Sequence, residues 1–263
     1  MSNEGSWLDV CPVCKVGSLQ ELSEKRLFGL SSTKGFRCSR CGAFFAPVRD
    51  RYQLVSVDDT SYPTWQEYNH QTLTTREWES IASGGMSDAR QRKADMQMWL
   101  THIKEHTPAL TQDEPPVILK RGEELKAVLP NITLLEPRKV ATGGYGGPSI
   151  RVAKGMYVRL GGFRAQSHEE IREIDRGVLT LTSRRLIFSG SKRVYEVSLK
   201  KILSVEPYSD GIAIRRSGKQ RTEYFVGTDK VMLDIQVGER RYREPLSGIV
   251  LKLLIEGLAS RLG

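Results

Sequence analysis

The four cysteines are the residues whose type and spacing most clearly predict chemistry. All of them lie in the first 41 residues, as two Cys-x-x-Cys pairs separated by 23 residues: Cys11, Cys14, Cys38 and Cys41. Two intervening residues let both thiolates of a tight turn face one ion, and backbone amides after the first thiolate stabilise its charge. Two such turns complete a tetrahedron, so we expect the four thiolates to hold one Zn²⁺.

Other uses of the four cysteines have to be weighed against zinc. Disulfides need an oxidising compartment, whereas residues 1–10 show no secretory leader. A thioredoxin-like redox pair needs a βαβ context that this segment lacks, and four thiolates can also hold iron. We favour Zn²⁺. Because four protein ligands leave no coordination position for water, we expect a structural metal and not a catalytic one.

Short strands are expected around the cysteines, at residues 19–22, 34–38 and 43–48. With its paired knuckles, the segment from about residue 8 to residue 50 resembles a zinc ribbon, and we assign residues 1–50 to it. Zinc ribbons bind nucleic acid, bind proteins or stabilise a terminus. Binding of nucleic acid would rest on Arg37 and Arg40, and exposed aromatic side chains beside them would favour it.

Residues 51–107 are expected to form a helical connector. Thr74 and Glu77 fit a capping box, and Leu73 with Trp78 fits a hydrophobic staple, so we expect a helix from about residue 75 to residue 83. A second helix should begin after Ser87 and stop before Pro108, because its apolar residues recur at helical spacing.

His102 and His106 lie four residues apart on this second helix and could share a metal. No third ligand is evident nearby, and the last turn of a helix also favours histidine through the helix dipole. We therefore expect both side chains on a solvated face. Residues 108–117, rich in proline and acidic residues, should form a linker.

The net charge of +9 is spread unevenly along the chain. Residues 1–50 carry +2, residues 51–116 carry −4 and residues 117–263 carry +11. A basic carboxy-terminal domain favours an anionic partner such as nucleic acid, lipid headgroups or an acidic protein surface. A basic surface can equally serve solubility alone.

From residue 118 the sequence predicts an antiparallel β domain. Short stretches alternate between apolar and polar residues, and turn residues separate them. The expected strands are 150–152, 156–160, 177–182, 185–189, 193–197, 202–207, 211–215, 222–226 and 231–237. After Pro245 an amphipathic helix follows, with its apolar side formed by Leu246, Ile249, Val250, Leu253, Leu254, Leu258 and Leu262.

Residues 177–188, followed by residues 197–202, look like the central hairpin of pleckstrin-homology-like domains, especially the GRAM and GLUE groups. The resemblance covers about residues 118 to 262, and the carboxy-terminal helix agrees with it. Together with the ribbon, the chain resembles uncharacterised bacterial zinc-ribbon proteins that carry such a domain. The resemblance implies an α+β, mainly β fold, in which a helix closes one end of a bent, seven-stranded partial barrel that binds proteins or lipids.

Some segments depart from a minimal domain of this kind. The glycine-rich residues 142–147 and the acidic residues 168–175 lie between early strands and lengthen those connections, so no ligand position of the family is transferred there. Residues 231–243 add an extra strand and a basic turn, which either serves a partner or merely lengthens the last hairpin.

The sequence does not predict an enzyme. Residues 143–149 are rich in glycine, but no Gly-Lys-Ser/Thr follows and Pro148 lacks the amide that a phosphate cradle would use. No His-Glu-x-x-His or Gly-x-Ser-x-Gly motif occurs, and the metal site takes every cysteine.

We therefore expect a non-enzymatic adaptor that docks a protein partner through the strand edges of the pleckstrin-homology-like domain. The alternatives are nucleic-acid binding by the ribbon and binding of an anionic phospholipid membrane by basic turns. The residues expected at such an anion or partner site are Lys192, Arg193, Arg215, Arg216, Lys219 and Arg221. Charges interrupt every window of about 20 residues, so no transmembrane segment is expected. A soluble, cytoplasmic, bacterial protein fits these features.

Overall fold

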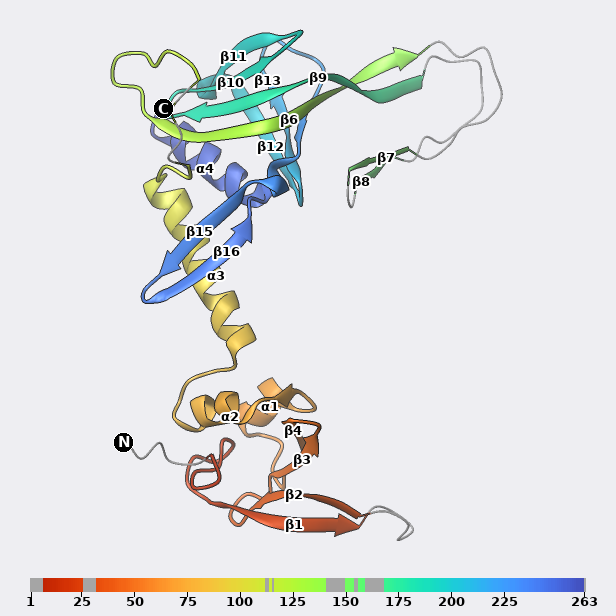
Figure 1. Cartoon of the computed structure of the whole chain (residues 1–263), viewed down its shortest axis with the longest axis vertical. Coiled ribbons are helices and arrows are strands. Elements are labelled where there is room, and N and C mark those ends of the chain that lie inside the picture. The colour runs from red at the N-terminus through yellow and green to blue at the C-terminus, as the bar shows by residue number, and fades with distance from the viewer. Residues whose placement is uncertain are drawn as a thin grey trace. The chain divides into compact units, whose positions relative to one another are not determined.

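The computed structural model describes residues 7–25, 32–111, 114, 116–140, 150–153, 156–158 and 168–262. The structure is mainly β, with several sheets and a carboxy-terminal helix. The chain divides into two compact units, Met1–Asp95 and Met96–Gly263. Each unit contains a hydrophobic core of its own. Figure 1 draws the helices and strands of both units.

The first unit is built on a five-stranded antiparallel sheet in the order β1-β2-β3-β4-β5. Of its two short helices, one lies between the fourth and fifth strands and the other follows the fifth, and a longer helix, α3, begins within this unit and continues into the next. The elements are β1 (Leu19–Lys25), β2 (Ser32–Cys38), β3 (Phe44–Val48), β4 (Arg51–Ser56), α1 (Pro63–Tyr68), β5 (Thr72–Leu73), α2 (Thr75–Ala82) and α3 (Asp88–His106). The three strands expected around the cysteines are present, whereas β4, β5 and α1 were not predicted.

The helices α1 and α2 belong to the same core as the cysteines. Tyr68, Trp78 and Ile81 are buried together with the cysteines and the apolar residues of the sheet. The predicted boundary at residue 50 falls in the turn between β3 and β4, where Val48 pairs with Arg51. Residues 51–82 are thus part of the cysteine-bearing unit, because their apolar side chains are buried there.

The local signals for helices correspond to real caps. The Glu77 amide donates to the Thr74 hydroxyl oxygen at 3.2 Å, and the Thr74 amide donates to the Glu77 carboxylate at 2.9 Å, which completes the capping box. Leu73 and Trp78 are both buried, as a hydrophobic staple requires. The end of α3 at His106 agrees with the stop expected before Pro108.

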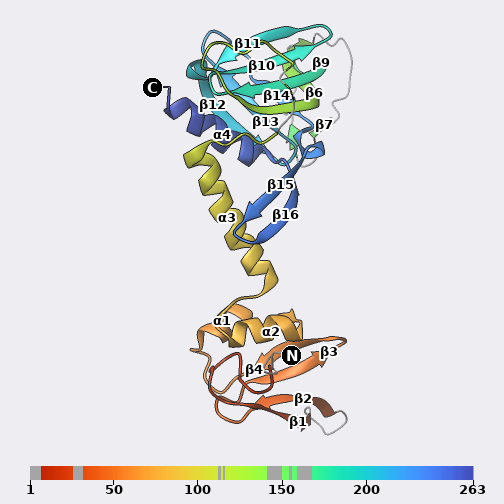
Figure 2. The ribbon, with the colours of Figure 1, turned by 60° about the vertical axis from the view of Figure 1, so that its left-hand side comes forward.

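The second unit contains a seven-stranded antiparallel sheet in the order β11-β10-β9-β6-β14-β13-β12. The first strand of this sheet, β6, therefore lies between β9 and the last strand, β14. Among the described residues the sheet is open, with β11 and β12 as its edges (Figure 2). The strands are β6 (Leu125–Val140), β9 (His168–Thr182), β10 (Arg185–Gly190), β11 (Val194–Ser198), β12 (Ile202–Tyr208), β13 (Gly211–Arg216) and β14 (Glu223–Val226).

Smaller elements complete the second unit. Two separate hairpins are formed by β7 (Ile150–Ala153) with β8 (Met156–Val158) and by β15 (Met232–Val237) with β16 (Arg240–Pro245). Single turns of 3₁₀ helix are η1 (Leu199–Lys201) and η2 (Thr228–Lys230), and the chain ends with the helix α4 (Gly248–Ser260). No helix among the described residues combines the length and apolar character needed to cross a membrane.

The helix α4 packs against β12, β13 and η1. Its buried apolar side chains include Leu251 and Ile255, which lay outside the predicted apolar face. Ile249, which the prediction placed on that face, is 39% exposed. The buried stripe is therefore rotated relative to the expectation. Besides the sheet, α4 meets the second half of α3, where Gly257 lies close to the Lys104 carbonyl.

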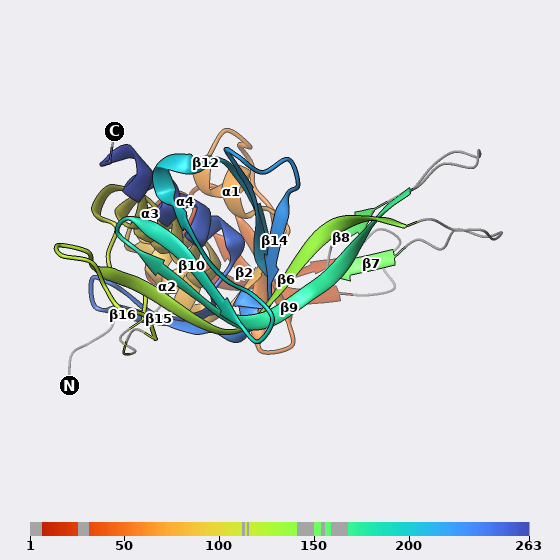
Figure 3. The same ribbon diagram turned by 90° about the horizontal axis from the view of Figure 1, so that it is seen from above.

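The expectation that residues 168–175 lengthen a connection is wrong. They form the first half of β9 and pair with β6, from His168 opposite Val140 to Asp175 opposite Leu134. The two long strands run side by side and extend beyond their neighbours (Figure 3). Arg172 and Glu173 are exposed there, whereas the buried Asp175 accepts hydrogen bonds from the amides of Lys192 and Arg193. The glycine-rich residues 142–147 lie outside the described residues.

Candidate metal centre

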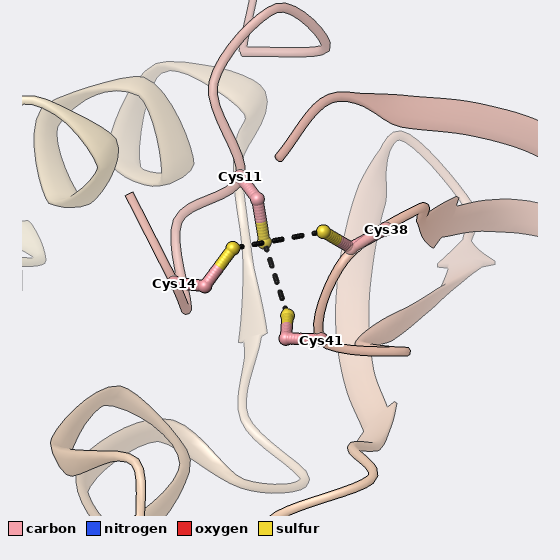
Figure 4. Close-up of side chains that lie close together, drawn as sticks. All are labelled: Cys11, Cys14, Cys38 and Cys41. Carbon is pink, nitrogen blue, oxygen red and sulfur yellow. Dashed lines mark hydrogen bonds between the residues drawn. The ribbon is translucent and has the colours of Figure 1, made fainter. Parts of the chain in front are cut away.

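The fold brings the four cysteines into one cluster. Cys11 and Cys14 come from the turn that precedes β1, whereas Cys38 ends β2 and Cys41 lies in the turn that leads into β3. All four sulfur atoms lie within 4.8 Å of one another. Figure 4 shows the side chains converging from two turns that are distant in sequence. Cys11, Cys38 and Cys41 are buried and Cys14 is half-buried.

The spacing of the sulfur atoms suits a tetrahedral metal ion. The Cys11 and Cys41 sulfurs are 3.7 Å apart, as are those of Cys14 and Cys38. A tetrahedron with metal–sulfur bonds of about 2.3 Å has edges of about 3.8 Å, so these separations suit one metal ion held by four thiolates. Disulfide sulfurs lie about 2 Å apart, and all four cysteines are free.

Backbone amides support the thiolates as the knuckle motif predicts. The Val13 amide donates to the Cys11 sulfur at 3.4 Å, and the Arg40 amide donates to the Cys38 sulfur at the same distance. A further amide, that of Gly17, donates to the Cys14 sulfur at 3.3 Å. Donors directed at sulfur stabilise its negative charge, which a thiolate ligand needs.

Two glycines allow the chain to fold this closely. Gly42 has a φ of +66°, the left-handed conformation that glycine adopts most easily, directly after the last ligand. Gly17 serves a different purpose, because a Cβ there would lie 2.5 Å from the sulfur of Cys38. The first turn can therefore approach the second only because residue 17 has no side chain.

Hydrogen bonds between the thiols shift the pKa values of Cys11 and Cys41 in opposite directions. The hydrogen bond from Cys11 lowers the pKa of Cys41 to about 5, and the same bond is the main cause that raises the pKa of Cys11. Burial raises the pKa of Cys38. A cation with four thiolate ligands would displace these protons, so metal binding here must depend on pH.

A shell of aromatic and helical residues surrounds the cluster. Trp7 packs edge-on against Phe45 at 5.5 Å, and Phe45 packs in the same way against Trp78 at 4.9 Å. The Thr64 hydroxyl of α1 donates to the carbonyl of Pro12, within the first Cys-x-x-Cys turn, at 3.2 Å. The sheet, both helices and the metal site thus share one hydrophobic core.

The six basic residues expected to bind an anion or partner fall into two groups. Arg193, Arg216 and Lys219 pair with buried carboxylates, whereas Lys192, Arg215 and Arg221 are exposed. The guanidinium of Arg193 lies 3.3 Å from Glu136, to which the Lys219 ammonium also binds. The β10–β11 and β13–β14 turns are therefore neighbours.

Glu136 and Glu223 are central to this ion network, and the sequence analysis did not identify them. Glu223 accepts from Arg216 and from Lys219, each at 2.7 Å. Burial would raise the pKa of Glu223, but these hydrogen bonds outweigh it and the pKa is lowered. The cations of Arg216 and Lys219 also lie over the ring of Tyr195, at 5.6 and 5.9 Å. Part of the basic charge therefore stabilises the sheet.

His102 and His106 are exposed, as expected for a solvated face of the helix. The rings of His102 and His106 are stacked with their centroids 4.5 Å apart, and neither belongs to the metal-ligand cluster found among the described residues. Arg37 forms an ion pair with Asp58 at 3.4 Å. Next to it, Phe36 packs against Trp7 at 5.4 Å, so this aromatic ring is engaged within the unit.

Comparison with known proteins gives no family for this chain. No protein-family model matches the sequence, and the search of curated proteins gave no match.

Proposed function

We propose that this protein is a non-enzymatic adaptor that docks a protein partner through a pleckstrin-homology-like domain and is stabilised by one structural Zn²⁺ in a zinc ribbon. The observation that carries the proposal is the order of the seven strands, with β6 in the middle and α4 packed against β12 and β13. Seven antiparallel strands and a terminal helix are the organisation that the resemblance implies. Such a sheet leaves two edges whose backbone groups can pair with a partner.

Zinc is proposed as the metal because four thiolates at tetrahedral spacing form a closed site. The purified protein should contain one Zn²⁺ per chain by elemental analysis. Cys38→Ser should lose the metal and lower the thermal unfolding temperature of the first unit, because metal binding contributes folding free energy. Ser39→Ala, at the exposed neighbouring position, should change neither. An iron–thiolate absorption spectrum, or a Cys38→Ser variant as stable as the wild type, would contradict the zinc assignment.

The adaptor proposal is tested by crosslinking affinity capture with the full-length protein at low and at physiological salt. A partner docked on strand edges should be retained at both salt concentrations, because backbone hydrogen bonds and packing are screened little. Loss of every protein partner at physiological salt would contradict the proposal.

The neighbouring basic turns favour one alternative, namely binding to anionic phospholipid. Lys192, Arg215 and Arg221 are exposed on or next to these turns, and Arg193 and Lys219 meet at Glu136. Flotation with vesicles containing phosphatidylserine tests this alternative. Arg215→Glu with Arg221→Glu should abolish vesicle binding if the turns contact lipid. The same variant should leave a protein partner bound to a strand edge.

A further inference from the structure

One edge of the seven-stranded sheet presents a regular set of backbone groups. Gly190 donates its amide to the carbonyl of Arg193 at 2.8 Å, and Leu199 donates to Arg184 at 2.9 Å. Bonded pairs alternate along an antiparallel ladder, so these two bonds fix the pattern for all of β11. The amides of Val194, Glu196 and Ser198 and the carbonyls of Val194 and Glu196 therefore point away from β10, whereas the Ser198 carbonyl caps η1. No described residue pairs with them through a strand ladder.

The opposite edge is less suited to pairing. β12 contains Pro207, which has no amide hydrogen, and its register with β13 shifts between Ile202 and Ser204. Prolines and bulges are the devices that prevent edge strands from pairing with other chains. β11 has neither feature, and its first residue, Val194, is an apolar side chain that is 73% exposed.

The charges around β11 indicate what could pair with it. Lys192 and Arg193 precede the strand, and Lys200 and Lys201 follow it. Lys192, Lys200 and Lys201 are exposed. The one carboxylate on the strand, Glu196, is already bound by Lys120 at 3.1 Å and by Arg185. An added strand would therefore lie between two clusters of positive charge.

We propose that the edge of β11 binds an extended, acidic peptide segment of a protein partner, which adds to the sheet as an eighth strand. The three outward-facing residues supply the backbone hydrogen bonds, and the flanking lysines select acidic residues in the peptide. A second copy of this chain is disfavoured as the occupant, because antiparallel pairing of two β11 strands would bring like charges together. This inference rests on the proposed function and specifies its docking site.

The test uses selection from a random dodecapeptide display library on the full-length protein. Val194→Pro removes one outward-facing amide at the first residue of an edge strand, where proline is tolerated. Val194→Thr is the matched control, because it keeps the amide and the β-branched side chain. Wild type and Val194→Thr should enrich peptides with an excess of aspartate and glutamate among β-branched residues. The selected peptides should bind Val194→Pro at least about tenfold more weakly.

A second measurement does not depend on the fold of the proline variant. In the wild-type protein, a selected peptide should slow hydrogen exchange at the amides of Val194, Glu196 and Ser198 and leave β12 unchanged. Reversing Lys200 and Lys201 to glutamate should weaken the same peptides and reduce the salt dependence of their binding. The inference is overturned if no acidic peptides are enriched, if Val194→Pro binds them equally, or if protection appears elsewhere.

These outcomes separate the inference from the proposed function. If crosslinking captures a native partner that Val194→Pro still retains, β11 is not the docking site but the adaptor function stands. If no variant or wild-type protein captures a partner at physiological salt, the adaptor proposal itself fails.

Discussion

At the scale of single residues, Gly17 determines whether the two cysteine turns can meet. Gly17→Ala would place a methyl group where the Cys38 sulfur lies, since an ideal Cβ is only 2.5 Å from it. Gly17 and Cys38 are both buried, so the added methyl group must displace the Cys38 sulfur or the first turn and distort the ligand geometry. We expect the affinity for Zn²⁺ to fall by about 10- to 100-fold, measured by competition with a chromogenic chelator.

The neighbouring exposed residue provides the control for this prediction. Ser18→Ala keeps the backbone, including the Ser18 carbonyl that accepts from the Ser39 amide, and should leave the affinity unchanged. Equal zinc affinities for Gly17→Ala and the wild type would show that the second turn can move away from residue 17.

Glu123 should make the stability of the second unit depend on pH in the acidic range. Its carboxylate accepts from Arg185 at 2.8 and 2.9 Å and from the Thr182 hydroxyl at 2.6 Å. The hydrogen bonds from Arg185 are the main cause that lowers its pKa from 4.5 to about 2. A lowered pKa means that this stabilisation is complete above pH 4.5 and is lost as the pH falls toward 2.

The free energy of unfolding, measured with urea between pH 6 and pH 2.5, tests this sign. Glu123→Gln should be less stable than the wild type near neutral pH, and the difference should shrink as the pH falls. Glu124→Gln, at an exposed position beside it, should differ less at every pH. A difference that stays constant across this range would contradict the role of the ionised Glu123.

At the scale of elements, the Glu136 and Glu223 network joins β6, β13 and β14 with the two basic turns. Lys219 contacts both carboxylates. Lys219→Met leaves two buried carboxylates with fewer partners and should cost about 3 kcal/mol of stability. Arg221→Met, in the same turn but exposed, should change the free energy of unfolding by less than about 0.5 kcal/mol. Equal effects of both substitutions in urea unfolding would show that the network contributes little.

Elements with strong local signals were predictable from sequence. The capping box at Thr74 and Glu77 and the Cys-x-x-Cys turns depend on residues a few positions apart, so a short window contains them.

β6 was missed because Pro130 and Asn131 interrupt its pattern. They lie at a register shift between Leu129 and Ile132, where Asn131 has a φ of +58°. A bulge absorbs this interruption only when β9 pairs alongside, and one sequence does not show that pairing.

The ion network was unpredictable for a related reason. Its carboxylates lie on β6 and β14, and its cations lie on β6, on β13 and in two turns, so only the folded sheet brings them together. The basic residues were recognised by their charge. Their buried partners were not, because an isolated glutamate in a sequence gives no sign of burial. Half of the predicted anion site is consequently engaged in stabilising the sheet.

At the scale of the whole molecule, the hydrophobic core of the second unit begins before the predicted linker, residues 108–117. Ile103 of α3 is fully buried in the core of the second unit. Within the predicted linker, the Leu110 amide donates to the carbonyl of Lys126 in β6 at 2.6 Å. Arg261, just after α4, donates to the Thr107 hydroxyl at 2.8 Å. The second half of α3 therefore behaves as part of the carboxy-terminal unit, although sequence patterning assigned it to a connector.

Two fragments distinguish these descriptions of the carboxy-terminal unit. A fragment of residues 87–263 keeps all of α3 with its Ser87 cap, whereas a fragment of residues 118–263 lacks Ile103, Thr107 and Leu110. Removing Ile103 alone exposes part of α4 and should cost about 2–5 kcal/mol, the usual penalty for deleting a buried aliphatic side chain. We expect the longer fragment to unfold cooperatively in urea and the shorter one to be markedly less stable or insoluble. If both fragments unfold with the same free energy, α3 contributes nothing to this core and the predicted boundary near residue 118 is the better one.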